Sequence, residues 1–401
     1  MYQNSTDKSK IENFRNLLIN STISRFGFSS FDLLIIWVVL YLTHSPFLSG
    51  LADGTLSFPL FISFIVGAYV DRISRKKILA VSASFLRSGS MIFIFASIML
   101  RNDFLILISI YFSAFMIGFT SDILNSIRAS WTKEFLDSEH YKSGTSIQSS
   151  LYSIAEGLGY VSSGILISQG MMGAFLGLFL IFTISVIPIF FIKDLKKIEM
   201  IDSGISNTLR EGILFIKSHR VVMEIMIISF LANFIFGMAG IIFIVLVQLH
   251  FRLPSVFVSL IFGLLMLGII AGSVYASKIG GKLGFISGIN LFIIGTSLFS
   301  IYFLNNIFLV LIPDAIIGIS IGIINVAIGT AVLKIIPQNM MARIQGAFST
   351  FSVAVVSLSG MIGGIIVQIT GYEGSFLLLG FVMIIMSPLS ILFKGMMSLR
   401  I

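Results

Sequence analysis

Long apolar runs recur along the whole chain of 401 residues, and they constrain the fold more than any other feature. Each run has roughly the 20 residues that a helix needs to cross a hydrocarbon core of about 30 Å. The predicted spans are residues 17–42, 48–70, 78–100, 104–126, 146–168, 171–192, 221–248, 255–277, 284–304, 307–333, 343–369 and 375–393. Because these runs are apolar on every face, barrel strands are excluded. The sequence predicts an all-α membrane protein with twelve transmembrane helices.

The composition excludes most soluble and catalytic classes of protein. Charged residues make up 11% of the chain, against about 25% in ordinary soluble domains. With no cysteine and only four histidines, which all fall in or near loops, we expect no metal site and no cofactor. A membrane enzyme or receptor is therefore the least favoured class, and the chain carries no phosphate-binding loop of the Gly-x-x-x-x-Gly-Lys-Ser/Thr type.

The basic residues predict the orientation in the membrane. Of the 26 Lys and Arg residues, 22 fall on one side of the alternating topology, whereas only Arg101 and Arg252 fall in the opposite loops. By the positive-inside rule, both termini are expected in the cytoplasm. The net charge of +8 then reflects topology and not a nucleic-acid partner. We expect a monomer in the cell membrane, in contact with lipid.

A polar stretch at the middle of the chain divides the spans into two sets of six. Glycines around the fifth and eleventh spans correspond at an offset of 201 residues, as Gly159 with Gly360 and Gly170 with Gly371, which suggests an internal repeat. The predicted parts are a cytoplasmic tail at 1–13, a six-helix half at 14–192, a cytoplasmic linker at 193–220 and a second half at 221–401.

A charged motif, here called the gate motif, stands between the second and third spans. It reads Gly67-Ala-Tyr-Val-Asp71-Arg72-Ile-Ser-Arg75-Lys76-Lys77. A glycine such as Gly67 lets two helices approach closely, and a carboxylate such as Asp71 can face the positive N-terminus of another helix. A charged turn that merely follows the positive-inside rule is the alternative.

This motif resembles the signature of the major facilitator superfamily, and the span count and central linker extend the resemblance over essentially the whole chain. It implies a transporter that moves a small molecule by alternating access. It also implies a cytoplasmic latch, in which Asp71 meets the start of span eleven and Arg75 bonds an acid near the end of span four, where Asp122 stands.

Within that superfamily the chain resembles macrolide-type drug effluxers and siderophore exporters. The likeness lies in Phe14-Arg15-Asn-Leu-Leu, in Arg87 of span three and in the segment 337–346 that enters span eleven. It implies proton-coupled export of a small amphipathic compound. Span five departs from the exporters' Gly-Pro-x-x-Gly-Gly pattern with Tyr160 and Ser163, which keeps proton-coupled or facilitated uptake of a metabolite as an alternative.

Four charged residues inside the spans are candidates for a proton or substrate site. Placing a charged side chain at the centre of a membrane helix costs about 2.5 to 3.5 kcal/mol on insertion scales, so each such residue is expected to have a function. Asp32 in span one is the first candidate for binding a proton or a cation, and a structural pair with Arg25 or Arg87 is equally favoured. Glu156 in span five either carries a proton or packs against serines. Asp314 in span ten could meet the substrate or close an outer gate.

Overall fold

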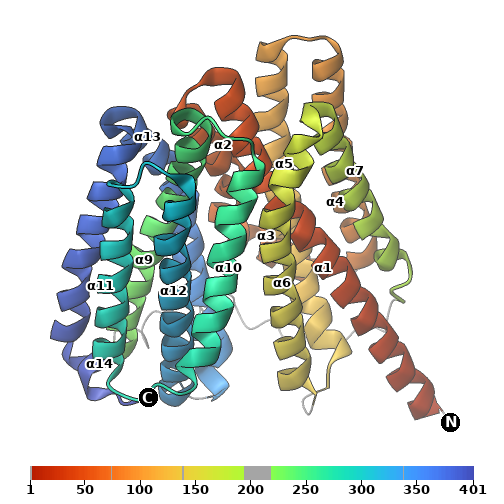
Figure 1. The fold of residues 1–401 in the computed structure, drawn as a ribbon. Helices are drawn as coiled ribbons and strands as arrows, with labels where there is room; N and C mark the ends of the chain where they lie inside the picture. The colour runs from red at the N-terminus through yellow and green to blue at the C-terminus, as the bar shows by residue number, and fades with distance from the viewer. Residues whose placement is uncertain (1, 74, 138–139, 194–217, 337) are drawn as a thin grey trace. The chain divides into compact units, whose positions relative to one another are not determined.

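The computed structural model describes the backbone of residues 2–73, 75–137, 140–193, 218–336 and 338–401, and nearly all of it is helical (Figure 1). The described residues form no strand, and their β pairing is a single antiparallel bridge between Lys282 and Arg400. The prediction of an all-α protein is therefore confirmed.

The first half contains the six predicted spans. Its helices are α1 (Tyr2–Thr43), α2 (Pro46–Ser57), the 3₁₀ turn η1 (Phe58–Ile62), α3 (Ser63–Arg72), α4 (Lys76–Met99), α5 (Asp103–Phe135), α6 (Tyr141–Ser168) and α7 (Gly170–Phe190). The second span is divided into α2, η1 and α3 because Pro59 has no N–H to continue the helical hydrogen bonds. The fourth span is longer than predicted, and α5 continues to Phe135.

The second half follows the same plan. Its elements are α9 (Arg220–Val245), the π-helical turn η2 (Leu246–His250), α10 (Val256–Ala276), α11 (Leu283–Ile301), α12 (Ile307–Ile335), α13 (Gln338–Leu392) and the short α14 (Lys394–Ser398). The element α13 holds the two last spans, which meet at the non-helical residue Gly371. The φ of 71° at Gly371 is a conformation that glycine adopts without strain.

The helices account for all twelve predicted spans. Nine helices in the described part of the chain are long and apolar enough to cross a membrane. The remaining three spans are the divided segment α2–η1–α3, the serine-rich α6 and the first of the two spans within α13.

The chain packs as two compact units that correspond largely to the two halves. The first unit comprises Met1–His44, Ala52–Ile201 and Pro254–Ser259, and the second comprises Ser45–Leu51, Asp202–Leu253 and Leu260–Ile401. Two short segments are exceptions: Ser45–Leu51 comes from the first half and is assigned to the second unit, and Pro254–Ser259 comes from the second half and is assigned to the first unit. Both lie at the start of the second span of their half. Of the predicted linker, residues 194–217 lie outside the described residues.

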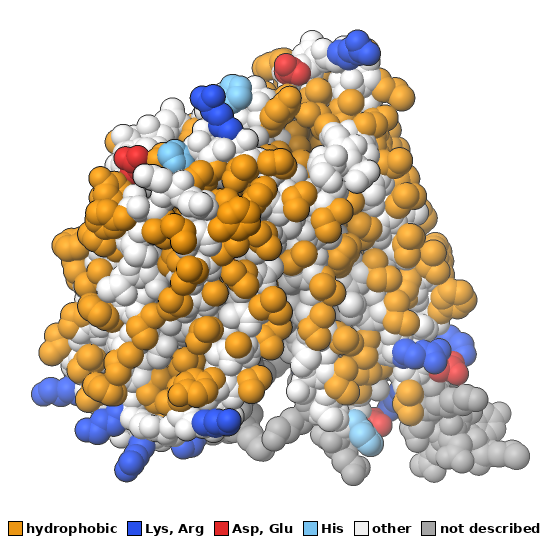
Figure 2. Space-filling view, in the orientation of Figure 1, with side chains coloured by type: hydrophobic (Ala, Val, Ile, Leu, Met, Phe, Trp, Pro, Cys, Tyr) orange, Lys and Arg blue, Asp and Glu red, His pale blue; other side chains and the backbone are white. Residues whose placement is uncertain are grey.

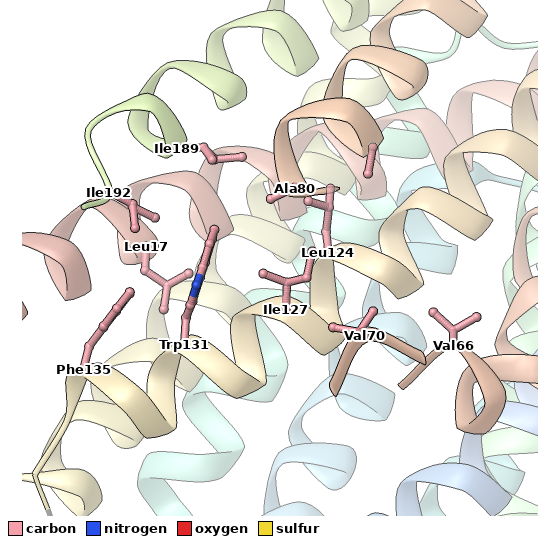
Figure 3. Close-up of a cluster of buried hydrophobic side chains, with 11 residues drawn as sticks. Leu17, Val66, Val70, Ala80, Leu124, Ile127, Trp131, Phe135, Ile189 and Ile192 are labelled. Carbon is pink, nitrogen blue, oxygen red and sulfur yellow. The ribbon is translucent and has the colours of Figure 1, made fainter. Parts of the chain in front are cut away.

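In the first unit, α1 packs against α5, α6 and α7, and α4 packs against α5 and α7. Buried side chains from α1, α3, α4, α5 and the end of α7 form one apolar cluster around Trp131 (Figure 3). Trp131 stacks on Phe135 with ring centroids 6.1 Å apart. This cluster fixes the C-terminal turns of α5 against the rest of the unit.

The segment predicted as a tail, residues 1–13, belongs to α1, which begins at Tyr2. Asn13 holds these turns in place, because its amide donates to the Lys193 carbonyl at 2.8 Å and accepts from the Lys193 N–H at 2.9 Å. Lys10 donates to the Asp137 carboxylate at 2.7 Å and holds the pKa of Asp137 below its usual value.

In the second unit, α13 packs against α9 and α11, and α11 packs against α12. Glycines let the backbones of α10 and α12 approach closely: a Cβ at Gly268 would lie 2.7 Å from the Ala315 carbonyl oxygen. Gly272, one turn later, meets the Ile319 backbone in the same way. Paired small residues one turn apart are typical of tightly packed membrane helices.

Apolar side chains cover the middle of the visible face in Figure 2, and Lys and Arg side chains gather toward its lower edge. Large side chains such as Phe93, Ile270 and Ile385 are more than half exposed. In water this surface would be unstable, whereas in a bilayer it faces lipid.

Candidate functional site

The polar groups of the first unit lie around one face of α1. Close packing against α6 brings that face to its partners: a Cβ at Gly159 would lie 2.6 Å from the Phe26 carbonyl oxygen. Next to it, the Ser30 hydroxyl is 2.8 Å from the Ser162 hydroxyl and donates to the Gly159 carbonyl at 3.0 Å. The small residues of α6 thus place side chains of both helices within bonding distance.

Arg25 of α1 forms an ion pair with Glu156 of α6. The two side chains are 19% and 28% exposed, and the Arg25 guanidinium also lies 4.6 Å from the centroid of the Tyr152 ring. Of the two interpretations of Glu156, neither included this pairing. Helix spacing alone does not reveal it, because the partner depends on how α6 is rotated.

Asp32 lies two turns beyond Arg25 on α1, within electrostatic reach of both Arg25 and Glu156. The Asp32 carboxyl lies close to that of Asp53 on α2 and to the Tyr160 hydroxyl of α6, near enough for either group to share a hydrogen bond with it. Asp53 is not among the four candidate residues from the sequence, because its contact with Asp32 depends on how α1 and α2 pack. Tyr160, which replaces the proline of the exporters, is part of the same group.

Arg87 of α4 is buried, with 2% of its surface exposed. Its guanidinium donates to the Ser24 hydroxyl at 2.5 Å and to the Ser121 hydroxyl, and it lies 4.6 Å from the centroid of the Phe182 ring. Its Nε has no hydrogen-bond partner among the described atoms. Arg87 therefore contacts two hydroxyls and an aromatic ring, and it forms no ion pair with a described carboxylate.

Arg128, which the sequence placed in a cytoplasmic loop, lies inside the extended α5 and is 7% exposed. It donates to the side-chain oxygens of Asn20 at 3.1 Å and Asn125 at 3.2 Å. One terminal nitrogen, Nη2, is buried without a partner among the described atoms. The loop assignment was wrong because α5 ends at Phe135, nine residues after the predicted end of span four.

Asp314 of α12 is a buried acid of the second unit. It is fully buried, and neither carboxyl oxygen has a hydrogen-bond partner among the described residues. Glu224 of α9 is a contrasting case, since it accepts from Arg220 Nε at 2.8 Å and from the Met396 N–H at 2.9 Å. Glu224 thus holds the start of α14 and has a structural role.

The gate motif is only partly described. The side chains of Asp71 and Arg72 lie outside the described residues. Asp122 is buried and accepts from Ser63 at 2.5 Å, whereas Arg75 is exposed and forms no ion pair with it. The Arg75–Asp122 latch therefore stays a prediction.

The structure also describes Gly67 and Lys76, the two remaining candidate residues of the gate motif. Lys76 donates to Ser130 of α5. At Gly67 a Cβ would meet Ser126 Oγ at 3.8 Å, an ordinary contact, so the described atoms leave room for a methyl group. Among the described atoms, no other helix approaches Gly67 as closely as predicted.

In the described part of the chain, no group of three or more His, Asp or Glu residues is placed to hold a metal ion. The buried and half-buried charged groups of the first unit that the structure describes include the carboxyls of Asp32, Asp53 and Asp122 and the guanidiniums of Arg87 and Arg128. Such an arrangement can bind protons and anions.

The comparisons with known proteins agree with this architecture. Residues 17–360 match the family model of the Major Facilitator Superfamily. YkuC of Bacillus subtilis (strain 168), an uncharacterized MFS-type transporter, is 26% identical over 375 residues, which span 88% of this chain and 85% of that protein.

Solved transporter structures share the fold. The crystal structure of a POT family transporter in complex with 5-aminolevulinic acid has a TM-score of 0.70 at 14% identity and covers 96% of each chain. That of a bacterial homologue of the iron transporter ferroportin, in the inward-facing state, has a TM-score of 0.71 at 14% identity and covers 97% of this chain and 99% of that one. The chain therefore belongs to the major facilitator superfamily and is a multi-pass membrane transporter.

Proposed function

We propose that this transporter is driven by protons and exports a small amphipathic compound, drug-like or metabolic, by alternating access. The close pair of carboxyls, Asp32 and Asp53, is the observation that carries the proton coupling. The resemblance to macrolide effluxers and siderophore exporters favours export.

The pair implies a bound proton for a chemical reason. An ionised carboxylate only accepts hydrogen bonds, so two carboxyls can bond each other only when one is protonated. Two neighbouring carboxylates away from water also resist ionising together. We expect the pair to hold one proton in one orientation of the transporter and to release it in the other.

Arg25 gives a route from the substrate to this pair. It interacts electrostatically with Asp32 while it is ion-paired to Glu156. A substrate that draws Arg25 away from its present position would change the field at Asp32 and hence its proton affinity. Binding can shift an equilibrium between orientations only by such a difference in interaction energy.

The test uses purified protein in liposomes that contain a trapped pH-sensitive dye. Three probes are added under an imposed proton gradient: the permanent cation tetraphenylphosphonium, the amine base erythromycin and the anion naphthalene-1-sulfonate. We expect at least one probe to evoke proton movement in the wild type, Asp53→Asn and Asp32→Asn to reduce it at least tenfold, and Asp103→Asn to leave it unchanged. Asp103 is an exposed acid in the first turn of α5 and serves as the matched control.

Glu156→Gln separates the two candidate proton carriers. If coupling is lost in Glu156→Gln and kept in Asp32→Asn and Asp53→Asn, the carrier is Glu156 and the assignment to the pair is wrong. Proton movement that persists in all three variants would contradict coupling through this site.

Uptake of a metabolite is the second candidate, and the departure in α6 favours it. Tyr160 and Ser163 replace the proline and glycine of proton-driven exporters, and α6 runs as an unbroken helix from Tyr141 to Ser168. The same liposomes distinguish the two directions. If a probe added to an acidic outer medium accumulates in the liposomes, it is taken up together with protons. If a trapped probe leaves toward the acidic side, it is exchanged for protons.

A further inference from the structure

Three arginines lie close together in the first unit, and among the described residues only one of them has an acidic partner. Arg25 is paired with Glu156. Arg87 and Arg128 are both more than nine-tenths buried, and their bonds go to the neutral side chains of serines and asparagines. Each of the two has a buried guanidinium nitrogen with no partner among the described atoms.

The three guanidiniums lie along one stretch of α1, since Arg128 bonds to Asn20, Arg87 bonds to Ser24 one turn later, and Arg25 is the next residue. Arg87 interacts electrostatically with Arg25 and Arg128, and all three interact with Tyr152 of α6. The Phe28 ring lies 5.4 Å from the Arg25 guanidinium and 5.9 Å from that of Arg87. Like charges held together in this way repel one another, so the arrangement calls for a negative charge.

The described acids of the neighbouring helices do not supply that charge to Arg87 or Arg128. No ion pair among the described residues joins an acid to either arginine. Glu156 of α6 pairs with Arg25, Glu12 of α1 pairs with Lys193, and Asp122 of α5 accepts from Ser63. The helix α7 contains no charged residue. A buried cation without a partner is costly in any protein and more so inside a membrane.

We propose that Arg87 and Arg128, with Arg25 at their side, bind the anionic group of the transported compound, a carboxylate, phosphate or sulfonate. Arginine suits this role because its planar fork matches such groups with two parallel hydrogen bonds. The rings of Phe28, Phe182 and Tyr152 would receive the apolar part of the molecule. This inference rests on the proposed transport function and narrows its substrate class to amphipathic anions.

Binding to this site is measured without any gradient, so it does not depend on proton coupling. Thermal unfolding of the purified protein is followed with naphthalene-1-sulfonate, benzoate and inorganic phosphate, against sodium chloride of equal ionic strength and against tetraphenylphosphonium. We expect naphthalene-1-sulfonate to raise the unfolding temperature with a saturating dependence on concentration, and tetraphenylphosphonium to leave it unchanged.

Variants then locate the effect. Arg128→Gln should weaken the apparent affinity for naphthalene-1-sulfonate at least tenfold, and Arg87→Lys, which keeps the charge and loses the fork, should weaken it by a smaller factor. Arg101→Gln is the matched control, since Arg101 is an exposed base in a loop, and it should bind as the wild type does. Lys is used at position 87 because a neutral residue there could prevent folding, whereas a folded Arg87→Lys variant still allows the affinity to be measured.

Several results would overturn the proposal. These are stabilisation by no anion, equal stabilisation by tetraphenylphosphonium, or unchanged affinity in both arginine variants. Lipid is tested separately: if phosphatidylglycerol stabilises the protein through Arg128 while no soluble anion does, the site holds a headgroup and not a substrate. Arginine-dependent anion binding without proton movement in liposomes would refute proton coupling and leave this site standing.

Discussion

At the scale of single residues, the sequence singled out four charged residues within apolar runs and missed how they pair. Arg25, Asp32, Glu156 and Asp314 all lie within long helices. The pairing of Arg25 with Glu156 and of Asp32 with Asp53 depends on the rotation of α1, α2 and α6 about their axes. Uniformly apolar helices carry no periodic pattern from which that rotation could be read.

Asp314 allows a test of what a buried group without partners does to stability. We expect Asp314→Leu to raise the unfolding temperature, because it removes a fully buried carboxyl that forms no described hydrogen bond, an unsatisfied group worth about 1–3 kcal/mol. Glu224→Leu is the matched control and should lower it, since Glu224 is equally buried but bonded twice. Thermal unfolding in detergent measures both, and a lower unfolding temperature in Asp314→Leu would refute the expectation.

At the scale of elements, the boundaries of the spans followed from hydropathy, and the exceptions have local causes. Pro59 divides the second span into α2, η1 and α3. The polar C-terminal turns of α5 stay helical because Trp131 and Phe135 are buried in the cluster of Figure 3. The polar residues after the predicted end of span four indicate a loop, and the sequence therefore placed Arg128 there. Burial of the two rings keeps this segment helical instead.

The glycine contacts between α10 and α12 give a prediction for helix packing. Gly268→Ala should lower the unfolding temperature, because the added methyl would lie 2.7 Å from the Ala315 carbonyl oxygen and overpacking costs about 1–3 kcal/mol. Gly240→Ala in α9 is the control, since no described atom lies within 4 Å of its Cβ position. That variant should be as stable as the wild type or more so, given the better helix propensity of alanine. Equal losses in the two variants would contradict close packing at Gly268.

At the scale of the whole molecule, the division into two six-helix halves was predictable because a mid-chain polar segment and repeated glycines mark it. Gly170 and Gly371, which correspond in the sequence, both have positive φ, at 81° and 71°. Each joins the fifth and sixth helices of its half. Equal backbone geometry at equivalent positions supports an internal repeat more strongly than the matching residues alone.

The predicted orientation can be tested directly, because the chain has no native cysteine. Single cysteines are introduced at two exposed loop positions on opposite sides, Ser277→Cys and Asn305→Cys. A membrane-impermeant maleimide should label Asn305→Cys in intact cells and Ser277→Cys only after the membrane is disrupted. The reverse pattern would place the termini outside and contradict the positive-inside assignment.

The tight turns at Gly170 and Gly371 limit how this protein can be engineered. Positive φ at both residues lets one helix end and the next begin almost at once, so hardly any free chain remains between them. Insertions succeed where the backbone is exposed and not committed to helical hydrogen bonds. An epitope tag or a protease site placed at either glycine would disrupt two helices together, whereas the loop around Asn305 offers chain that belongs to neither neighbouring helix.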